Sequence, residues 1–200
     1  MKNLYLRSML AAACAVTLAA CGGSGGNLYL SGQVSNLAKD GLILLNDGER
    51  LSVPAGQSSF VFTKLVKTDD RYDITIAEQP KGAVCSITNG SGKATSYSVS
   101  TTVVSCTTNT YPLSGKITGL TAGGLRLVMG PNGSSPLAGT DSYKFDSVPD
   151  GAPYSISILP PQPTGLKCRF QGSTSADGSD TVGTMGSAPT TAAALDCTPQ

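Results

Sequence analysis

The chain contains no histidine and no tryptophan, and only 6% of its residues are aromatic. Histidine is the usual base beside a serine or cysteine nucleophile, the side chain that titrates near neutral pH, and the commonest metal ligand. Its absence excludes Ser-His and Cys-His catalysis. We therefore expect a protein that is not an enzyme, with no catalytic residues, no cofactor and no metal site. A hydrolase that uses paired carboxylates is kept only as a minor third alternative.

Two acidic clusters are candidates for carboxylate or cation chemistry. Asp69, Asp70 and Asp73 lie just before and within a segment that alternates like a strand. Asp177 and Asp180 resemble part of a calcium loop, but no run of ligands of the EF-hand kind follows them. We interpret the first cluster as a solvated turn and strand edge, and the second as a flexible polar loop.

Charged residues are scarce and almost balanced. They make up 14% of the chain, with 14 Lys and Arg against 13 Asp and Glu, and the basic residues are scattered among acidic ones. Binding to a phosphate backbone requires a basic patch or stripe. The sequence therefore predicts no nucleic-acid partner.

The chain also lacks an apolar run long enough to cross a membrane. The run from Met9 to Ala20 holds about a dozen apolar or small residues, whereas a transmembrane helix needs roughly 20. Lys2 and Arg7 precede this run, and small residues end it, which is the order of an export signal. We predict that residues 1–20 are a signal peptide.

Leu18-Ala19-Ala20-Cys21, at the end of the signal, resembles a bacterial lipobox. The resemblance implies that Cys21 becomes the first mature residue and carries a thioether-linked diacylglycerol and an amide-linked acyl chain, such as palmitate. Several chains together give stable attachment to a membrane. The alternative is ordinary export with cleavage near Ala20, which would leave a reactive thiol at an exposed terminus.

The residues after Cys21 bear on where the anchored protein resides. Gly22 follows the cysteine, whereas an Asp at that place marks inner-membrane retention in lipoproteins of enteric-type bacteria. The resemblance therefore implies the outer membrane and leaves open whether the protein faces the periplasm or the cell surface. Residues 21–27 are Gly and Ser rich and predict a short flexible tether.

The remainder of the chain contains an internal duplication, which predicts two repeats at 28–109 and 110–200. Leu30–Leu37 returns as Leu113–Leu120, and the register continues through several later motifs. The matching later positions are Gln79-Pro80 with Gln162-Pro163, Gly82 with Gly165, Cys85 with Cys168, and, one position out of register, Tyr72–Ile76 with Tyr154–Ile158. The second copy differs by a longer stretch from Gly172 to Ala194, which we expect to be an exposed loop.

The duplication also assigns the disulfides. Cys14 leaves with the signal and Cys21 is acylated, so that four cysteines remain in an exported chain, where disulfides persist. Four cysteines allow three pairings. Because each copy contains two of the four cysteines, we predict that they pair within each copy as the disulfides Cys85–Cys106 and Cys168–Cys197. The absence of a CxxC spacing and of histidine argues against a metal site at these cysteines.

Within each copy, apolar and polar residues alternate at period two between turn residues, which is typical of strands. No helical period continues for three turns after residue 27. We predict an all-β fold of two tandem small β-sandwiches of the immunoglobulin or transthyretin type. The predicted core consists of Val34, Leu44, Phe60, Phe62, Tyr72, Ile74 and Ile76 in the first copy, and Ile117, Leu127, Phe145, Tyr154, Ile156 and Ile158 in the second.

The order of motifs in both copies is similar to the carboxypeptidase-regulatory-like and prealbumin-like modules of uncharacterised proteobacterial surface proteins. In the first copy the likeness is carried by Gly32-Gln33-Val34, Leu42–Leu45, Ser59–Phe62 and Tyr72–Ile76. In both copies it is carried by the stretch that leads to the first cysteine, Gln79–Cys85 and Gln162–Cys168. It implies a stalk, spacer or binding module and brings no catalytic residues.

We therefore expect a membrane-anchored surface lipoprotein of structural, adhesive or binding type, with a protein or glycan partner. The alternative is a periplasm-facing accessory or assembly lipoprotein. Such a protein would bind an envelope protein by β-augmentation, in which a client strand pairs with an exposed sheet edge.

Overall fold

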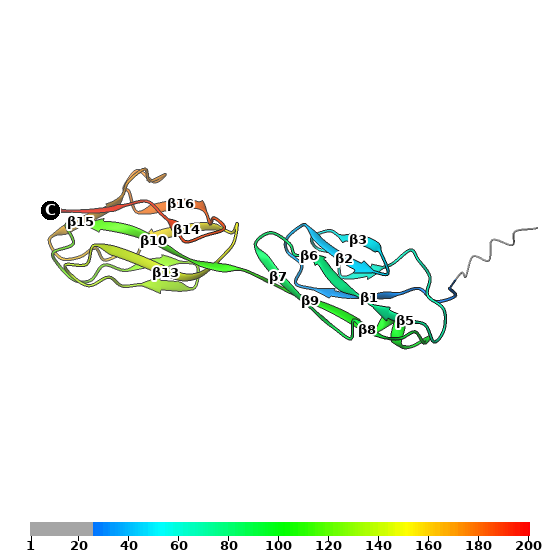
Figure 1. Ribbon diagram of the computed structural model, residues 1–200. Coiled ribbons are helices and arrows are strands. Elements are labelled where there is room, and N and C mark those ends of the chain that lie inside the picture. Colours follow the sequence, from blue (N-terminus) through cyan, green and yellow to red (C-terminus); the bar gives the residue numbers. More distant parts are fainter. Residues whose placement is uncertain (1–25) are drawn as a thin grey trace, which may run out of the picture.

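The computed structural model describes residues 26–200 and shows two β-modules lying end to end (Figure 1). The predicted signal peptide, Cys21 and most of the predicted tether lie outside the described residues. Within residues 26–200 the only helical element is a single 3-10 turn, Ser98–Ser100. No helix in this part of the chain is long and apolar enough to cross a membrane. The predicted all-β class is confirmed.

The first module contains a four-stranded sheet, a three-stranded sheet and a two-stranded pair. The four-stranded sheet has the order β4-β1-β9-β7, the three-stranded sheet has the order β3-β2-β6, and β5 pairs with β8. The strands are β1 Ser31–Ser35, β2 Leu42–Asn46, β3 Glu49–Val53, β4 Ser59–Val61, β5 Arg71–Asp73, β6 Thr75–Glu78, β7 Ala83–Thr88, β8 Ser91–Lys93 and β9 Thr102–Thr108.

The second module repeats this plan. One sheet has the order β13-β10-β18-β15, with β17 also on β10, and the other has the order β12-β11-β14-β16. The strands are β10 Thr110–Thr118, β11 Leu127–Met129, β12 Asn132–Ser134, β13 Ser142–Pro149, β14 Pro153–Ile158, β15 Leu166–Phe170, β16 Asp180–Thr184, β17 Thr190–Thr191 and β18 Leu195–Pro199.

In each module the first and last strands lie side by side in the middle of one sheet and run parallel. β1 pairs with β9 from Gly32 opposite Thr102, and β10 pairs with β18 from Ile117 opposite Leu195. All other strand pairs of these sheets are antiparallel except β10 with β17. The first and last strands of each module are thus hydrogen-bonded to each other, so each module is a self-contained structural unit.

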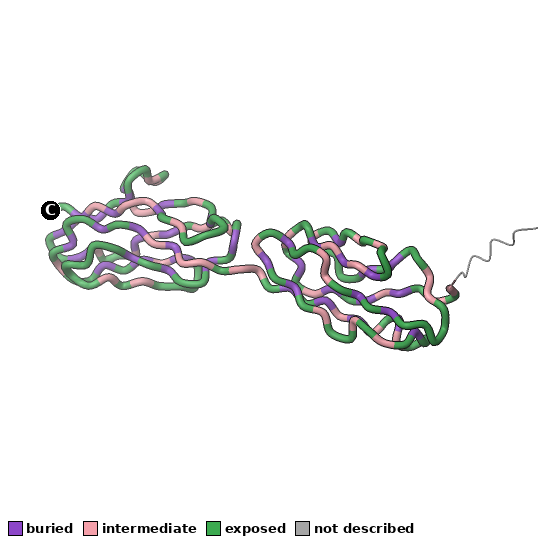
Figure 2. Tube along the Cα trace, viewed as in Figure 1, coloured by how far each residue is buried: buried purple, intermediate pink, exposed green. Residues whose placement is uncertain are grey.

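Each module has its own hydrophobic core, formed where buried and exposed residues alternate along the strands (Figure 2). Phe60 and Phe62 pack edge to face at 5.8 Å in the first core, and Tyr143 packs in the same way on Phe170 at 5.9 Å in the second. The residues predicted for the cores are buried, except that Ile76 and Tyr154 are only partly buried.

The local predictions differ from the structure at two places in the first module. The single strand predicted for Tyr72–Ile76 is divided at Ile74, whose N–H leaves the flanking strands and donates to Gly90 O. This division lets β5 pair with β8, in a segment where a turn was expected. Leu28-Tyr29-Leu30 also alternates in the way that predicts a strand, but it forms only an isolated bridge between Leu28 and Val66.

The largest difference lies between Gly172 and Ala194, where an exposed loop was expected. This segment contains β16 and β17, and β16 pairs with β14 along its whole length. Its Gly, Ser, Thr and Ala residues carry little apolar alternation, so the pattern does not predict a strand. The segment becomes a strand because the edge of β14 supplies partners for its backbone.

Candidate functional site

The structure contains both disulfides assigned by the duplication, Cys85–Cys106 and Cys168–Cys197. Each joins neighbouring antiparallel strands of one sheet, β7 with β9 and β15 with β18. They therefore do not connect the two sheets of a sandwich, as the bridge of antibody domains does. Cys21, the predicted lipidation site, lies outside the described residues.

The repeated Gln-Pro motif protects the open edge of the strand that carries the first cysteine of each module. Cys85 N–H donates to Gln79 Oε1 at 2.8 Å, and Gln79 Nε2 donates to the Cys85 carbonyl at 2.9 Å. Gln162 makes the same two bonds with Cys168, at 3.1 and 3.2 Å. Because β7 and β15 are the last strands of their sheets, each glutamine amide occupies the place that a further strand would take.

Of the two acidic clusters, the one at Asp69, Asp70 and Asp73 is exposed, as expected for a turn and strand edge, and the one at Asp177 and Asp180 stabilises its own loop. Asp177 accepts hydrogen bonds from the Ser179 hydroxyl and N–H, and these bonds, with one from Ser175, lower its pKa to about 2. Asp180 accepts from Ser173, Thr174 and Ser175, which lowers its pKa as well. Within residues 26–200, no three His, Cys, Asp or Glu side chains are grouped closely enough to hold a metal ion.

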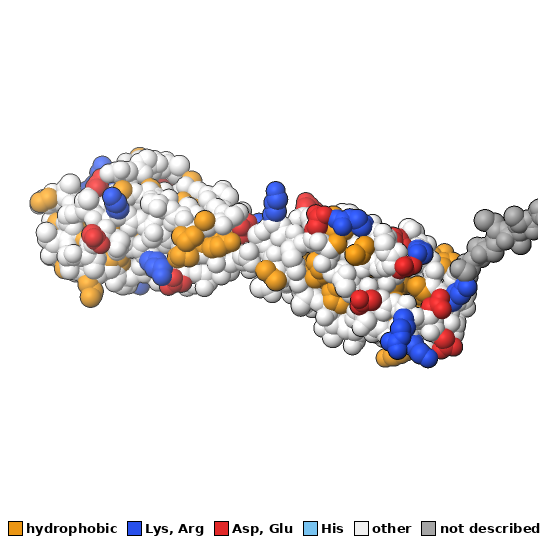
Figure 3. All heavy atoms as spheres, in the orientation of Figure 1, with side chains coloured by type: hydrophobic (Ala, Val, Ile, Leu, Met, Phe, Trp, Pro, Cys, Tyr) orange, Lys and Arg blue, Asp and Glu red, His pale blue; other side chains and the backbone are white. Residues whose placement is uncertain are grey.

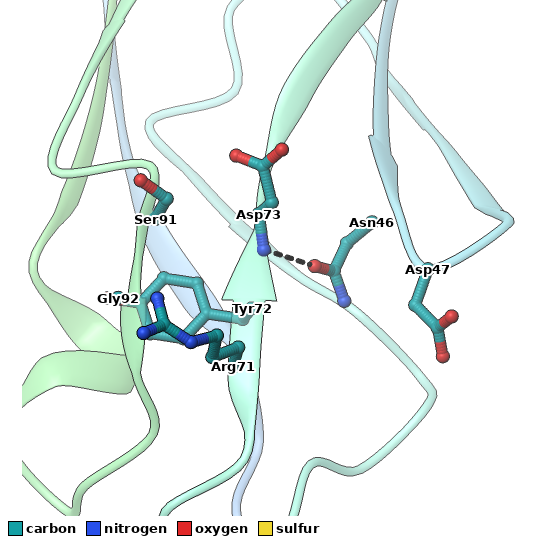
Figure 4. Close-up of a pocket in the computed structure, with 7 residues that line it drawn as sticks. All are labelled: Asn46, Asp47, Arg71, Tyr72, Asp73, Ser91 and Gly92. Atoms are coloured by element: carbon teal, nitrogen blue, oxygen red, sulfur yellow. Dashed lines mark hydrogen bonds between the residues drawn. The ribbon is translucent and has the colours of Figure 1, made fainter.

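A polar hollow of about 550 Å³ lies in the first module, where the end of β2 meets β5 and β8 (Figure 4). It lies toward the end of the module at which the described chain begins (Figure 1). Asn27, near that beginning, is hydrogen-bonded to Thr68, which lies shortly before β5 in the chain. Its volume falls in the range of about 300 to 1,000 Å³ that is usual for ligand pockets. The hollow is lined by Asn46, Asp47, Arg71, Tyr72, Asp73, Ser91 and Gly92.

Asn46 is the central polar residue of this hollow and is only 2% exposed. Its Oδ1 accepts a hydrogen bond from Asp73 N–H at 3.1 Å, which fixes the orientation of the amide (Figure 4). Its Nδ2 makes no hydrogen bond to any residue in 26–200, and it is not sealed off from solvent. The donors of a buried amide are therefore left open toward the hollow.

Two charged groups beside Asn46 can also contact a ligand. The Arg71 guanidinium and the Asp73 carboxylate form no ion pair or side-chain hydrogen bond within the described part of the chain. Asp47 lies across the hollow and pairs with the exposed Lys64. Tyr72 is buried and donates its hydroxyl to Ser98 O at 3.1 Å, so it forms a wall of the hollow rather than a free polar contact.

In the second module β14 runs unbroken where the first module has β5 and β6, and the polar groups of the hollow are absent. In the register of the duplication, Asn46 corresponds to Met129, Arg71 to Pro153 and Asp73 to Ser155. The fold therefore does not require these polar side chains. Sequence reasoning missed Asn46 and Arg71, and the signal that could have found them is this difference between aligned copies.

A second constellation lies at the junction of the two modules, where only Asn109 separates β9 from β10. Asn109 N–H donates to Gly82 O at 2.9 Å, and its carbonyl accepts from Asp150 N–H at 2.8 Å. The single connecting residue is thus bonded to both modules. Tyr111-Pro112, at the boundary of the two copies, predicts packing at the junction, and Tyr111 is half-buried against the core of the second module.

An ion pair crosses the same junction. Lys39 of the first module donates to Asp150 Oδ1 at 2.9 Å and to its carbonyl at 2.7 Å. Asp150 is only 7% exposed, and its Oδ2 lacks a hydrogen-bond partner of normal geometry. Hydrogen bonding by Lys39, and next by the nearby Ser187, holds the pKa of Asp150 below its ordinary value although burial opposes this.

Comparison with known proteins gives little beyond the fold. No family model and no curated protein matches the sequence. The structure is similar to GBS52, a minor pilin of Streptococcus agalactiae, at 8% identity and a TM-score of 0.31, covering 87% of this chain and 98% of the pilin. It is also similar to the major pilin T3.2 of Streptococcus pyogenes, at 11% identity and a TM-score of 0.29, covering 86% and 96%. These likenesses are too distant to bear on function.

Proposed function

We propose that this chain is a lipid-anchored envelope protein of the adhesive or structural type, in which Cys21 holds two aligned β-modules at the outer membrane. The observation that carries the proposal is the one-residue junction at Asn109, bonded on both sides. Domains joined by flexible linkers reorient freely, whereas short bonded connections restrict their motion. A protein built in this way extends a binding surface from its anchor.

Binding rather than catalysis is supported by the polar groups that the described residues bring together. The polar hollow offers donors and acceptors, but the Ser91 hydroxyl makes no hydrogen bond to the Asp73 carboxylate opposite it among the described residues. The acidic loop at Asp177 and Asp180 is satisfied by its own serines. On the face shown in Figure 3, positive and negative side chains are interspersed over both modules. This arrangement favours recognition through a local site over recognition of a uniformly charged partner.

The alternative, an accessory protein that captures a client strand, receives less support. Gln79 and Gln162 occupy the edges of β7 and β15 at the cysteines, so that a client strand would have to displace them. At two other edges, β4 and β13, no side chain from residues 26–200 is hydrogen-bonded to the backbone of the strand.

The anchor is tested by the variant Cys21→Ser in cells. We expect the wild-type chain to fractionate with membranes and to incorporate a labelled fatty acid, and the variant to lose both properties. Unchanged fractionation and labelling in the variant would refute the anchor.

The face of the membrane and the alignment of the modules need separate measurements. Protease shaving of intact cells would degrade a surface-facing protein and spare a periplasmic one. Small-angle scattering should give a longer, narrower distance distribution for the wild-type chain than for a variant with a Gly-Ser segment inserted after Asn109. Identical distributions would contradict the aligned arrangement.

A further inference from the structure

We propose that the polar hollow of the first module binds a saccharide through its hydroxyl groups. The inference rests on the proposed adhesive function and names the chemical class of the partner. It begins from Asn46, whose side chain is almost completely buried while its Nδ2 has no protein partner. Because Nδ2 remains open to solvent while Asp73 N–H holds the amide in place, a ligand acceptor can replace water at Nδ2 without a movement of the side chain.

The groups around Asn46 select the ligand class. Asn46 Nδ2 and Arg71 donate, the carboxylates of Asp47 and Asp73 accept, and the Ser91 hydroxyl does both. A hydroxyl group also donates and accepts, so a ligand with several adjacent hydroxyls can satisfy this mixed set. Asp47 is already paired with Lys64, and the Asp73 carboxylate balances the Arg71 guanidinium, so the hollow has no excess positive charge that would favour phosphate or another anion.

The geometry allows several hydroxyls to bind at once. Asp73 N–H holds the Asn46 amide in place, and the backbone pairing of β5 with β8 sets Asp73 opposite Ser91 and Arg71 opposite Lys93 (Figure 4). Because the polar atoms come from the β5–β8 pair and from the end of β2, which the bond from Asp73 N–H to Asn46 joins to β5, they are held in position before a ligand arrives. Gly92 opposite Tyr72 adds no side chain to this face.

The second module serves as an internal comparison. At the position of Asn46 it has Met129, a side chain that cannot donate or accept well, in the same strand context. The polar set is therefore an addition to the shared fold and not a requirement of it. We infer one saccharide site per chain, in the first module.

The test uses the full chain in detergent, with neutral hexoses and N-acetylhexosamines at millimolar concentration as probes, observed by saturation-transfer-difference NMR. Arg71→Met and Asp73→Ala remove exposed side chains, so the fold should persist, and each should weaken binding about tenfold because each removes a charge-assisted hydrogen bond. Asn46→Met, which introduces the residue of the second copy, should abolish it. Arg126→Met, at an exposed arginine of the second module, is the matched control and should bind normally.

The outcomes separate the possibilities. Loss in the three variants with retention in the control supports the site, as does binding confined to vesicles that contain a glycolipid, which would assign the sugar to a membrane source. Absence of binding to every free sugar and glycolipid overturns the proposal, as does binding that survives both Arg71→Met and Asp73→Ala. Binding of trilysine, a cationic probe, in place of sugars would also overturn it. The Cys21→Ser chain should still bind sugar, so failure of the anchor and failure of the site are distinguishable.

Discussion

Replacing Gln79 by alanine should destabilise the first module and expose the edge of its main sheet. Gln79 makes two hydrogen bonds, to the N–H and the carbonyl of Cys85. A typical hydrogen bond contributes about 0.5 to 1.5 kcal/mol net. The Gln79 side chain is exposed, so water can partly replace it at the open edge. We therefore expect a loss of about 1 to 2 kcal/mol in the free energy of unfolding, in the lower half of the range of about 1 to 3 kcal/mol for two bonds.

The assay is urea denaturation followed by circular dichroism, on the full chain with both disulfides intact. Gln57→Ala is the control, because Gln57 is an exposed glutamine of the same module whose side chain makes no hydrogen bond within residues 26–200. Gln162→Ala should produce a loss of the same sign in the second module. The uncovered edge at Cys85 should also make Gln79→Ala self-associate at high concentration, which sedimentation velocity can measure.

The outcome that refutes this reasoning is an equal midpoint and slope for Gln79→Ala and Gln57→Ala. In that case the two bonds to Cys85 would add nothing beyond what water provides, and the repeated Gln-Pro motif would have no role at the sheet edge. Destabilisation without self-association would retain the energetic argument but contradict the protective role of the glutamine.

Three further predictions concern the junction and the disulfides. A Cβ at Gly82, where φ is +77°, would lie 2.5 Å from Asp150 Cγ, whereas Gly165, its counterpart with φ +72°, has open space around it. Gly165→Ala should therefore lose only the backbone preference, about 1 to 2 kcal/mol, and Gly82→Ala should lose more and also broaden the distance distribution in small-angle scattering. The lowered pKa of Asp150 means that its contribution to stability is present above its unfolded pKa of about 3.9 and is lost as the pH falls through the lower folded value. Scattering curves should thus be unchanged from pH 7 to pH 5 and change only in stronger acid, and Lys39→Met should change them already at pH 7; a transition of the wild-type chain near pH 6 would contradict this. Reduction of the disulfides, which close loops with sequence separations of 21 and 29, should lower the stability of each module by about 3 kcal/mol in thermal melts, and unchanged melting would contradict the prediction.

Most of the strand pattern could be predicted because each strand buries one face, so that its side chains alternate. Phe60 with Phe62, and Ile156 with Ile158, show this alternation clearly and are buried. β16 could not be predicted in this way, because it is held by backbone bonds to β14 and its side chains contribute little to the core. The division of Tyr72–Ile76 was also invisible, since it depends on the Gly90 carbonyl that reaches Ile74 from another segment.

The candidate site was less predictable than the fold. Asn46 follows a strand and precedes Asp47-Gly48, so in sequence it is typical of a turn residue. Its burial, and the meeting of its amide with Asp73, depend on the placement of β2 beside β5. The junction was placed near Tyr111, whereas its polar contacts come from Lys39, Gly82 and Asp150.

The sequence by itself determined the all-β class and the cysteines available for bridging, because alternation and internal repetition are properties of neighbouring and aligned residues. Its lipobox resemblance also predicts the anchor at Cys21, which lies outside the described residues. The tertiary structure alone decided where the two modules bond to each other and where the polar hollow forms. Those features join Lys39 to Asp150 and Asn46 to Asp73, residues that are distant along the chain, and only strand register and module packing bring them within hydrogen-bonding distance.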